Sequence, residues 1–153
     1  VMGKPEGSGC YCYVNNLLKA IMDKTSADYD LIVIDTPAGL EHFSRKIFPD
    51  LDDLIVVTDE SKRGLTTGER IRDIAREMGL KYKDLYVIVN KVTAGRQEAV
   101  LENAAGIGLE VIATIPYDEN LAKFDLVGDP LMGLPDDSPA VQEITKVVGR
   151  LGL

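Results

Sequence analysis

The stretch "LIVVTDESKRGLTTGERI", residues 54–71, decides the fold because a strand pattern passes directly into a helical one. Its first four residues are a short, continuous apolar run, typical of a β-strand that is covered on both faces. Apolar residues then recur at spacings of three and four: Ile71, Ile74, Ala75 and Met78. Gly79 follows where a helix C-terminal cap is expected. The stretch therefore predicts one strand-to-helix unit of a parallel sheet.

Three more apolar runs of the same kind occur along the chain: "LIVI" (31–34), "LYVIV" (85–89) and "VIATI" (111–115). Helical patterns are found at residues 14–21 and 96–105, and a last helix begins with Ser138 as N-cap and Pro139 in its first position. This last helix has four apolar residues that we expect to face the sheet: Val141, Ile144, Val148 and Leu151. Strands that alternate with helices predict an α/β fold, an open, mostly parallel sheet with helices on both faces. We expect a single domain over residues 1–153.

The composition excludes some classes of function. With 25 acidic and 17 basic residues, the chain of 153 residues carries a net charge of −8, which disfavours binding to nucleic acid. No apolar run approaches the ~20 residues of a membrane span, and no secretory leader opens the sequence. The last helix mixes acidic and basic residues on its polar face instead of presenting a lysine-rich stripe. We therefore expect a cytoplasmic protein without stable membrane binding.

Polar residues follow each apolar run, at the sheet edge where ligands bind in open α/β folds. They form four segments: "DTPAGLEH" (35–42), "TDESKRG" (58–64), "NK" (90–91) and "PYDEN" (116–120). Asp35, at a strand tip, can hold Mg²⁺ directly or through water, and Gly39 leaves room for the backbone to approach a γ-phosphate. Asn90 can read a base edge with its amide, while the stem of Lys91 can lie along the ring. Plainer alternatives are that Asp35 caps a turn and that the Asn-Lys pair is an ordinary loop.

Taken together, "YDLIVIDTPAGLEH", "LIVVTDESKRGLTTGERI", "VIVNK" and "IPYDENLAKFDLVGDPL" resemble the MinD/ParA group of deviant P-loop ATPases. The segments "GKPEGSGCYCYVNNLL" and "AGLEHFSRK" are similar to the CooC-type ATPases that help mature nickel carbon monoxide dehydrogenase. The pair Thr36-Pro37 is closer to MinD than to CooC. The resemblance implies that Asp35 is the switch aspartate near Mg²⁺, with Gly39 beside it. It also implies that Asn90, with Pro116 and Tyr117, borders the adenine of ATP or ADP.

A Walker A motif is absent from the sequence. The glycine-rich "GKPEGSG" (residues 3–9) has no Lys-Ser or Lys-Thr after its last glycine, so it lacks the lysine and hydroxyl of a phosphate cradle. In the family this motif precedes the region seen here. We therefore expect the chain to be the C-terminal part of a P-loop NTPase domain. The family hydrolyses ATP, but the chain alone is expected to be inactive and to bind ATP weakly or not at all.

Both cysteines, Cys10 and Cys12, stand one residue apart before the first helical pattern. A disulfide across one residue is strained, and a tetrahedral thiolate site needs four ligands. Two chains related by a two-fold axis could supply four thiolates to one Zn²⁺ or Ni²⁺ ion. From the residues alone, a metal site and two plain thiols stay equally open, and the resemblance favours the metal. The lone His42 is expected to be structural.

The function that this resemblance implies is an ATP-dependent accessory protein for nickel insertion into carbon monoxide dehydrogenase. It would act as a homodimer with a Cys-x-Cys metal site at the interface, and the nickel enzyme would be its client. One alternative is a metal-binding dimerisation module without ATPase activity. Another is a MinD/ParA-like spatial-organisation ATPase that acts on membrane or DNA, against which the acidic charge counts.

Overall fold

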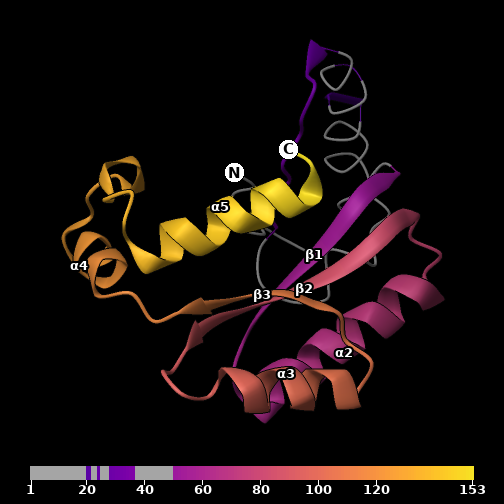
Figure 1. The fold of residues 1–153 in the computed structure, drawn as a ribbon. Helices are drawn as coiled ribbons and strands as arrows, with labels where there is room; N and C mark the ends of the chain where they lie inside the picture. Colours follow the sequence, from indigo (N-terminus) through magenta and orange to yellow (C-terminus); the bar gives the residue numbers. More distant parts are fainter. Residues whose placement is uncertain (1–19, 22–23, 25–27, 37–49) are drawn as a thin grey trace, which may run out of the picture. The chain divides into compact units, whose positions relative to one another are not determined.

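The computed structural model describes residues 20–21, 24, 28–36 and 50–153 (Figure 1). The chain divides into two compact units. The first comprises Val1–Leu51 and Ile74–Lys81, and the second comprises Asp52–Asp73 and Tyr82–Leu153. In the first unit, the backbone carbonyl of Lys81 accepts a hydrogen bond from the N–H of Leu51, and the Lys81 side chain pairs with Asp50. The second unit contains nearly the whole sheet and its covering helices.

The sheet has three parallel strands, β1 (Leu51–Asp59), β2 (Tyr82–Val92) and β3 (Val111–Pro116), in the order β1-β2-β3. All three point the same way in Figure 1, so their carboxyl ends share one edge. The runs predicted at 54–57, 85–89 and 111–115 are confirmed as strands, each longer than its apolar core. The prediction of an open α/β fold with a parallel sheet is therefore confirmed.

Helices cover both faces of the sheet (Figure 1). On one face, α2 (Lys62–Glu77) and α3 (Gln97–Gly106) enclose a core with Val87 and Val89, both fully buried. On the other face, α5 (Pro139–Leu151) packs on β3 and encloses Ile88 and Ile112. Since β2 alternates between two cores, its sequence has to be apolar at successive positions. This double burial is the physical reason for the continuous apolar run.

Side chains of two arginines tie helices to neighbouring elements. Arg72 of α2 donates to the carbonyls of Ile107 and Gly108 at 2.9 and 3.0 Å, which satisfies the C-terminal end of α3. Arg150 of α5 donates to the carbonyl of Ile112 in β3. Both charged side chains therefore fasten a helix to a neighbouring element by donating to backbone carbonyl groups.

Two sequence expectations need correction, and one helix lies outside the expectations. The run at 31–34 forms no strand among the described residues, where Leu31, Ile32 and Val33 are exposed without a pairing strand. On α5, the buried residues are Ala140 and Val147, and Leu151 packs against the same core as predicted, whereas Ile144 and Val148 are more than 40% exposed. A further helix, α4 (Glu119–Val127), had not been predicted. The 3₁₀ turn η3 (Leu131–Gly133) follows it.

Candidate functional site

The candidate site lies at the carboxyl edge of the sheet, where β1, β2 and β3 end at Asp59, Val92 and Pro116. The N–H of Tyr117 donates to the carbonyl of Val92 at 3.2 Å, so the chain segments that leave β2 and β3 stay joined just beyond the strands. Of the four polar segments expected at one edge, those at 58–64, 90–91 and 116–120 are therefore brought together. The segment at 35–42 begins in the first unit, and its residues 37–42 lie outside the described part of the chain.

The end of β1 is built as a tight turn into α2. Asp59 accepts hydrogen bonds from the hydroxyl and the N–H of Ser61, the latter at 2.9 Å, and these bonds lower the pKa of Asp59. The Ser61 hydroxyl in turn accepts the N–H of Gly64 at 3.0 Å and caps the helix. A Cβ at Gly64 would lie 2.3 Å from Asp59 Oδ1, so only glycine fits this turn.

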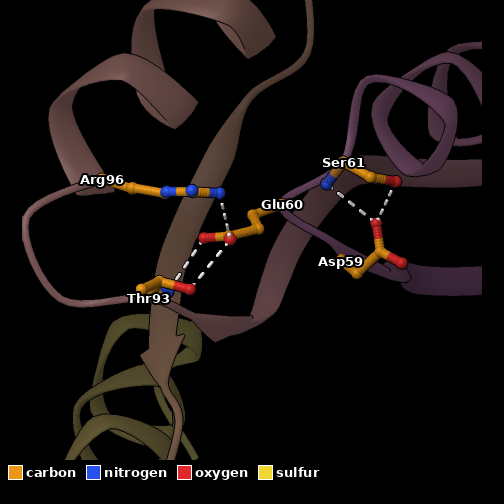
Figure 2. A network of polar contacts seen from close by, with 5 residues as sticks. All are labelled: Asp59, Glu60, Ser61, Thr93 and Arg96. Atoms are coloured by element: carbon orange, nitrogen blue, oxygen red, sulfur yellow. Dashed lines mark hydrogen bonds and ion pairs between the residues drawn. The ribbon is translucent and has the colours of Figure 1, made fainter.

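A second carboxylate, Glu60, joins the end of β1 to the loop after β2, as Figure 2 shows. It accepts the N–H of Thr93 at 2.8 Å, the hydroxyl of Thr93 at 2.9 Å, and Arg96 Nη1 at 3.1 Å. The backbone bond from Thr93 is the largest influence on the pKa of Glu60, which is lowered although partial burial opposes the shift. Glu60 therefore stays ionised, with its side chain only 18% exposed. No local sequence pattern points to Glu60, because its partners lie 33 and 36 positions away.

Asn90 and Lys91 lie inside β2 instead of beyond it, which corrects the expectation that they follow the strand. Val89 pairs with Thr114 and Val92 with Pro116, so β2 uses one residue more than β3 across this interval. The pair therefore forms a β-bulge. Lys91 takes a left-handed backbone conformation, with φ of 59°, and donates its N–H to Asn90 Oδ1 at 2.9 Å. Within the described residues, the side-chain nitrogen of Asn90 has no hydrogen-bond acceptor, so both its donors are available.

Two hollows open at this edge. The larger, of about 500 Å³, is lined by residues of β1, the first turns of α2 and the bulge: Val57, Thr58, Asp59, Ser61, Arg63, Gly64, Thr67, Asn90 and Lys91. The smaller, of about 150 Å³, has Thr93, Thr114 and Pro116 among its lining residues. Tyr117 is 59% exposed and lines neither. The four residues expected to border a base thus share an edge, but Asn90 and Lys91 line a different hollow from Pro116.

Beyond Tyr117, one buried carboxylate caps two helices. Asp118 Oδ1 accepts the N–H of Asn120 at 2.8 Å and that of Leu121 at 3.3 Å, at the start of α4. Its Oδ2 accepts the N–H of Ala140 at 3.0 Å and the hydroxyl of Ser138, at the start of α5. Burial raises the pKa of Asp118, but these donors outweigh it and lower the pKa overall. Ser138 is the N-cap residue as predicted, although Asp118 performs the capping.

Other expected site residues stay predictions. Asp35 is exposed and belongs to the first unit. Gly39, the cysteines Cys10 and Cys12, and His42 lie outside the described residues. Where side chains are described, no group of three or more histidine, cysteine, aspartate or glutamate residues could hold a metal ion. Nor is any helix in that part long and apolar enough to cross a membrane.

Comparison with known proteins places these features in context. The chain is 45% identical over 151 residues to an uncharacterized ATP-binding protein of Methanocaldococcus jannaschii, covering 99% of the chain and 60% of that protein. It is 30% identical over 141 residues to the carbon monoxide dehydrogenase accessory protein CooC of Rhodospirillum rubrum, covering 90% of the chain and 50% of CooC. The solved structure of the cell division protein MinD of Aquifex aeolicus matches with a TM-score of 0.69 and 26% identity, over 90% of the chain and 58% of MinD. No protein-family model matches. The chain thus spans between half and two thirds of the length of these relatives.

Proposed function

We propose, from the premise that the chain belongs to the MinD/ParA-type family of deviant P-loop ATPases, that it supplies the base-binding side of an ATP site. The observation that carries this proposal is the bulge at Asn90-Lys91, which opens onto the larger hollow with two free amide donors. A purine ring offers nitrogen acceptors on its edges, to which an amide can donate.

The chain's own residues would orient the base. Asn90 would donate to the ring, and the stem of Lys91 would lie beside it. Glu60 would hold the loop at Thr93 next to this bulge through its three hydrogen bonds. Bound ATP with Mg²⁺ supplies the phosphoryl group that the family transfers to water, with Asp35 and Gly39 as its predicted neighbours. No Walker A lysine is present in the 153 residues, so the phosphates would gain little from this chain.

The test is a titration of the isotopically labelled chain with adenosine, ATP and guanosine, followed by nuclear magnetic resonance. We expect adenosine and ATP to shift the amide signals of Asn90 and Lys91 with equal dissociation constants, on the order of millimolar. Equality is expected because the base, and not the triphosphate, makes the contacts. Asn90→Ala should abolish the shifts, whereas Asn103→Ala, on the exposed side of α3, should not. Undiminished adenosine binding by Asn90→Ala would contradict the proposal.

A second candidate function is nickel delivery to carbon monoxide dehydrogenase, with ATP hydrolysis coupled to a metal site shared by two chains. The similarity to CooC and the pair Cys10 and Cys12 favour it. Four thiolates from two chains would complete a tetrahedral Zn²⁺ site, or hold Ni²⁺ in a flatter geometry. Native mass spectrometry after addition of Zn²⁺ or Ni²⁺ should find a dimer with one ion. The same metal content in a Cys10→Ala, Cys12→Ala double variant would exclude this site.

A further inference from the structure

The segment of α4 and η3, residues 119–133, which we call the arm, lies at the end of the ribbon labelled α4 in Figure 1. Its exposed apolar side chains form what we call the patch. Within seven positions, four apolar side chains are exposed by 55% or more: Leu126 at 87%, Val127 at 67%, Leu131 at 55% and Met132 at 97%. Isolated exposed apolar residues are ordinary, but a cluster of this kind marks an interaction site.

Folding of the arm does not need these four side chains. The inward side of α4 is provided by Leu121, which packs on the core under α5, and by Phe124. The ring of Phe124 lies against Gly133, where a Cβ would be 3.2 Å away, and so closes η3 onto α4. Gly128, with φ of 74°, ends the helix and lets the N–H of Asp129 reach the carbonyl of Phe124 at 3.0 Å. The turn is thus stabilised from within while the patch points outward.

The surroundings of the patch are strongly acidic. Between positions 119 and 137 the sequence has five acidic residues, all exposed, and a single base, Lys123: the acids are Glu119, Asp125, Asp129, Asp136 and Asp137. Within the described residues, none of the six takes part in an ion pair. The negative charge of the five acidic residues, which we call the rim, is therefore available to a partner. It repels anionic lipid surfaces and nucleic acid, and it also repels a second copy of a chain whose net charge is −8.

We infer that the arm is a docking site for a basic amphipathic helix of a partner protein. The apolar stripe of such a helix would cover Leu126, Val127, Leu131 and Met132, and its flanking lysine or arginine residues would face Asp125 and Asp129. Burial of the apolar side chains supplies most of the affinity, and the acidic rim selects the sign of the partner's charge. This inference goes beyond the nucleotide site and does not depend on it.

The experiment measures fluorescence anisotropy of labelled 18-residue peptides titrated with the chain. The probe peptide is a leucine–lysine helix with leucine at the i, i+3, i+4 and i+7 spacing. One control peptide keeps the leucines and replaces lysine by glutamate; the other keeps the lysines without an apolar stripe. We expect saturable binding of the probe alone, weakened at least about tenfold by Leu126→Ser with Met132→Ser. A matched variant, Leu101→Ser on the exposed side of α3, should bind as the unaltered chain does.

Charge reversal tests the rim separately. Asp125→Lys with Asp129→Lys should weaken the leucine–lysine probe and make the leucine–glutamate peptide bind instead. Circular dichroism of each variant shows that the fold is kept. Equal binding of both lysine peptides, or no effect of the Leu126 and Met132 substitutions, would overturn the inference. So would self-association of the chain that these same substitutions abolish, since the occupant would then be a second copy.

Discussion

The carboxylate of Glu60 accepts both the backbone N–H and the hydroxyl of Thr93, at 2.8 and 2.9 Å, and so fastens the end of β1 to the loop after β2. This loop follows the bulge that presents Asn90. We predict that Glu60→Gln exposes the amide of Thr93 to faster hydrogen exchange, because a neutral amide accepts more weakly and loses the ion pair with Arg96. Glu102→Gln, at an exposed position on α3, should leave the rate unchanged.

The same variant should also weaken adenosine binding if Glu60 positions the bulge. A merely stabilising role would lower the thermal midpoint and leave the dissociation constant for adenosine at its original value. Measuring both quantities on Glu60→Gln and on Thr93→Ala separates the two roles. Unchanged hydrogen exchange at Thr93 in Glu60→Gln would contradict the described network.

Asp118 should be among the most sensitive positions in the chain. Asp118→Ala removes the caps of α4 and α5 at once and leaves four donors without an acceptor. We expect the free energy of unfolding to fall by about 2–4 kcal/mol, since each lost cap costs about 1 kcal/mol and buried unpaired donors add to it. Asp136→Ala, at an exposed position, is the control. Urea denaturation of both variants measures the difference.

Asp118 should also make stability depend on pH. Its pKa in the folded protein lies below the ordinary value of 3.8, so the unfolded chain takes up the proton first as the pH falls. The stabilisation is complete above 3.8 and is lost as the pH falls through the folded pKa. Thermal midpoints measured from neutral pH downward should therefore fall less steeply for Asp118→Asn. Thermal midpoints that fall equally steeply with pH in the unaltered chain and in Asp118→Asn would contradict this prediction.

Two glycine substitutions should change the free energy of unfolding in opposite directions. Gly64→Ala places a Cβ 2.3 Å from Asp59 Oδ1 and 2.6 Å from Thr58 Oγ1, so we expect a loss of about 1–3 kcal/mol as the turn is forced open. A Cβ at Gly149, inside α5, would meet no atom within 4 Å apart from the backbone of its own helix. Gly149→Ala should therefore raise the free energy of unfolding by about 0.5–1 kcal/mol through its higher helix propensity. Chemical denaturation of the pair tests both signs in one experiment.

Apolar patterns were enough to predict β1, β2, β3, α2 and α3, because each of these elements is defined by the core it contacts, whereas the start of α5 was predicted from Ser138 and Pro139. Apolar periodicity does not predict α4, because the signals that define this helix are local and polar. Asp118 caps it and Gly128 ends it, while its exposed leucine and valine blur the amphipathic pattern. Hydrophobicity alone predicts a strand at 31–34, but it cannot reveal whether a pairing strand is present.

The site was predictable only in part. Strand ends in a parallel sheet identify the edge, so Asn90, Lys91 and Pro116 could be placed there from the sequence. The Glu60 network depends on contacts across more than 30 positions, for which no local pattern exists. The separation of Pro116 from the hollow of Asn90 likewise follows from side-chain packing, which spacing along the chain does not encode.

The bulge at Asn90-Lys91 also determines which face of β2 the side chain of Val92 occupies. Val89 and Val92 are three positions apart, so regular alternation would place them on opposite faces, yet both belong to the core beneath α2 and α3. The extra residue shifts the phase of the strand and returns Val92 to that core. Substitutions at 90 and 91 keep this phase, and deletion of either residue would remove the bulge while leaving Val92, then two positions after Val89, on the same face. The bulge thus adds one residue at the sheet edge while the core beneath α2 and α3 keeps Val92.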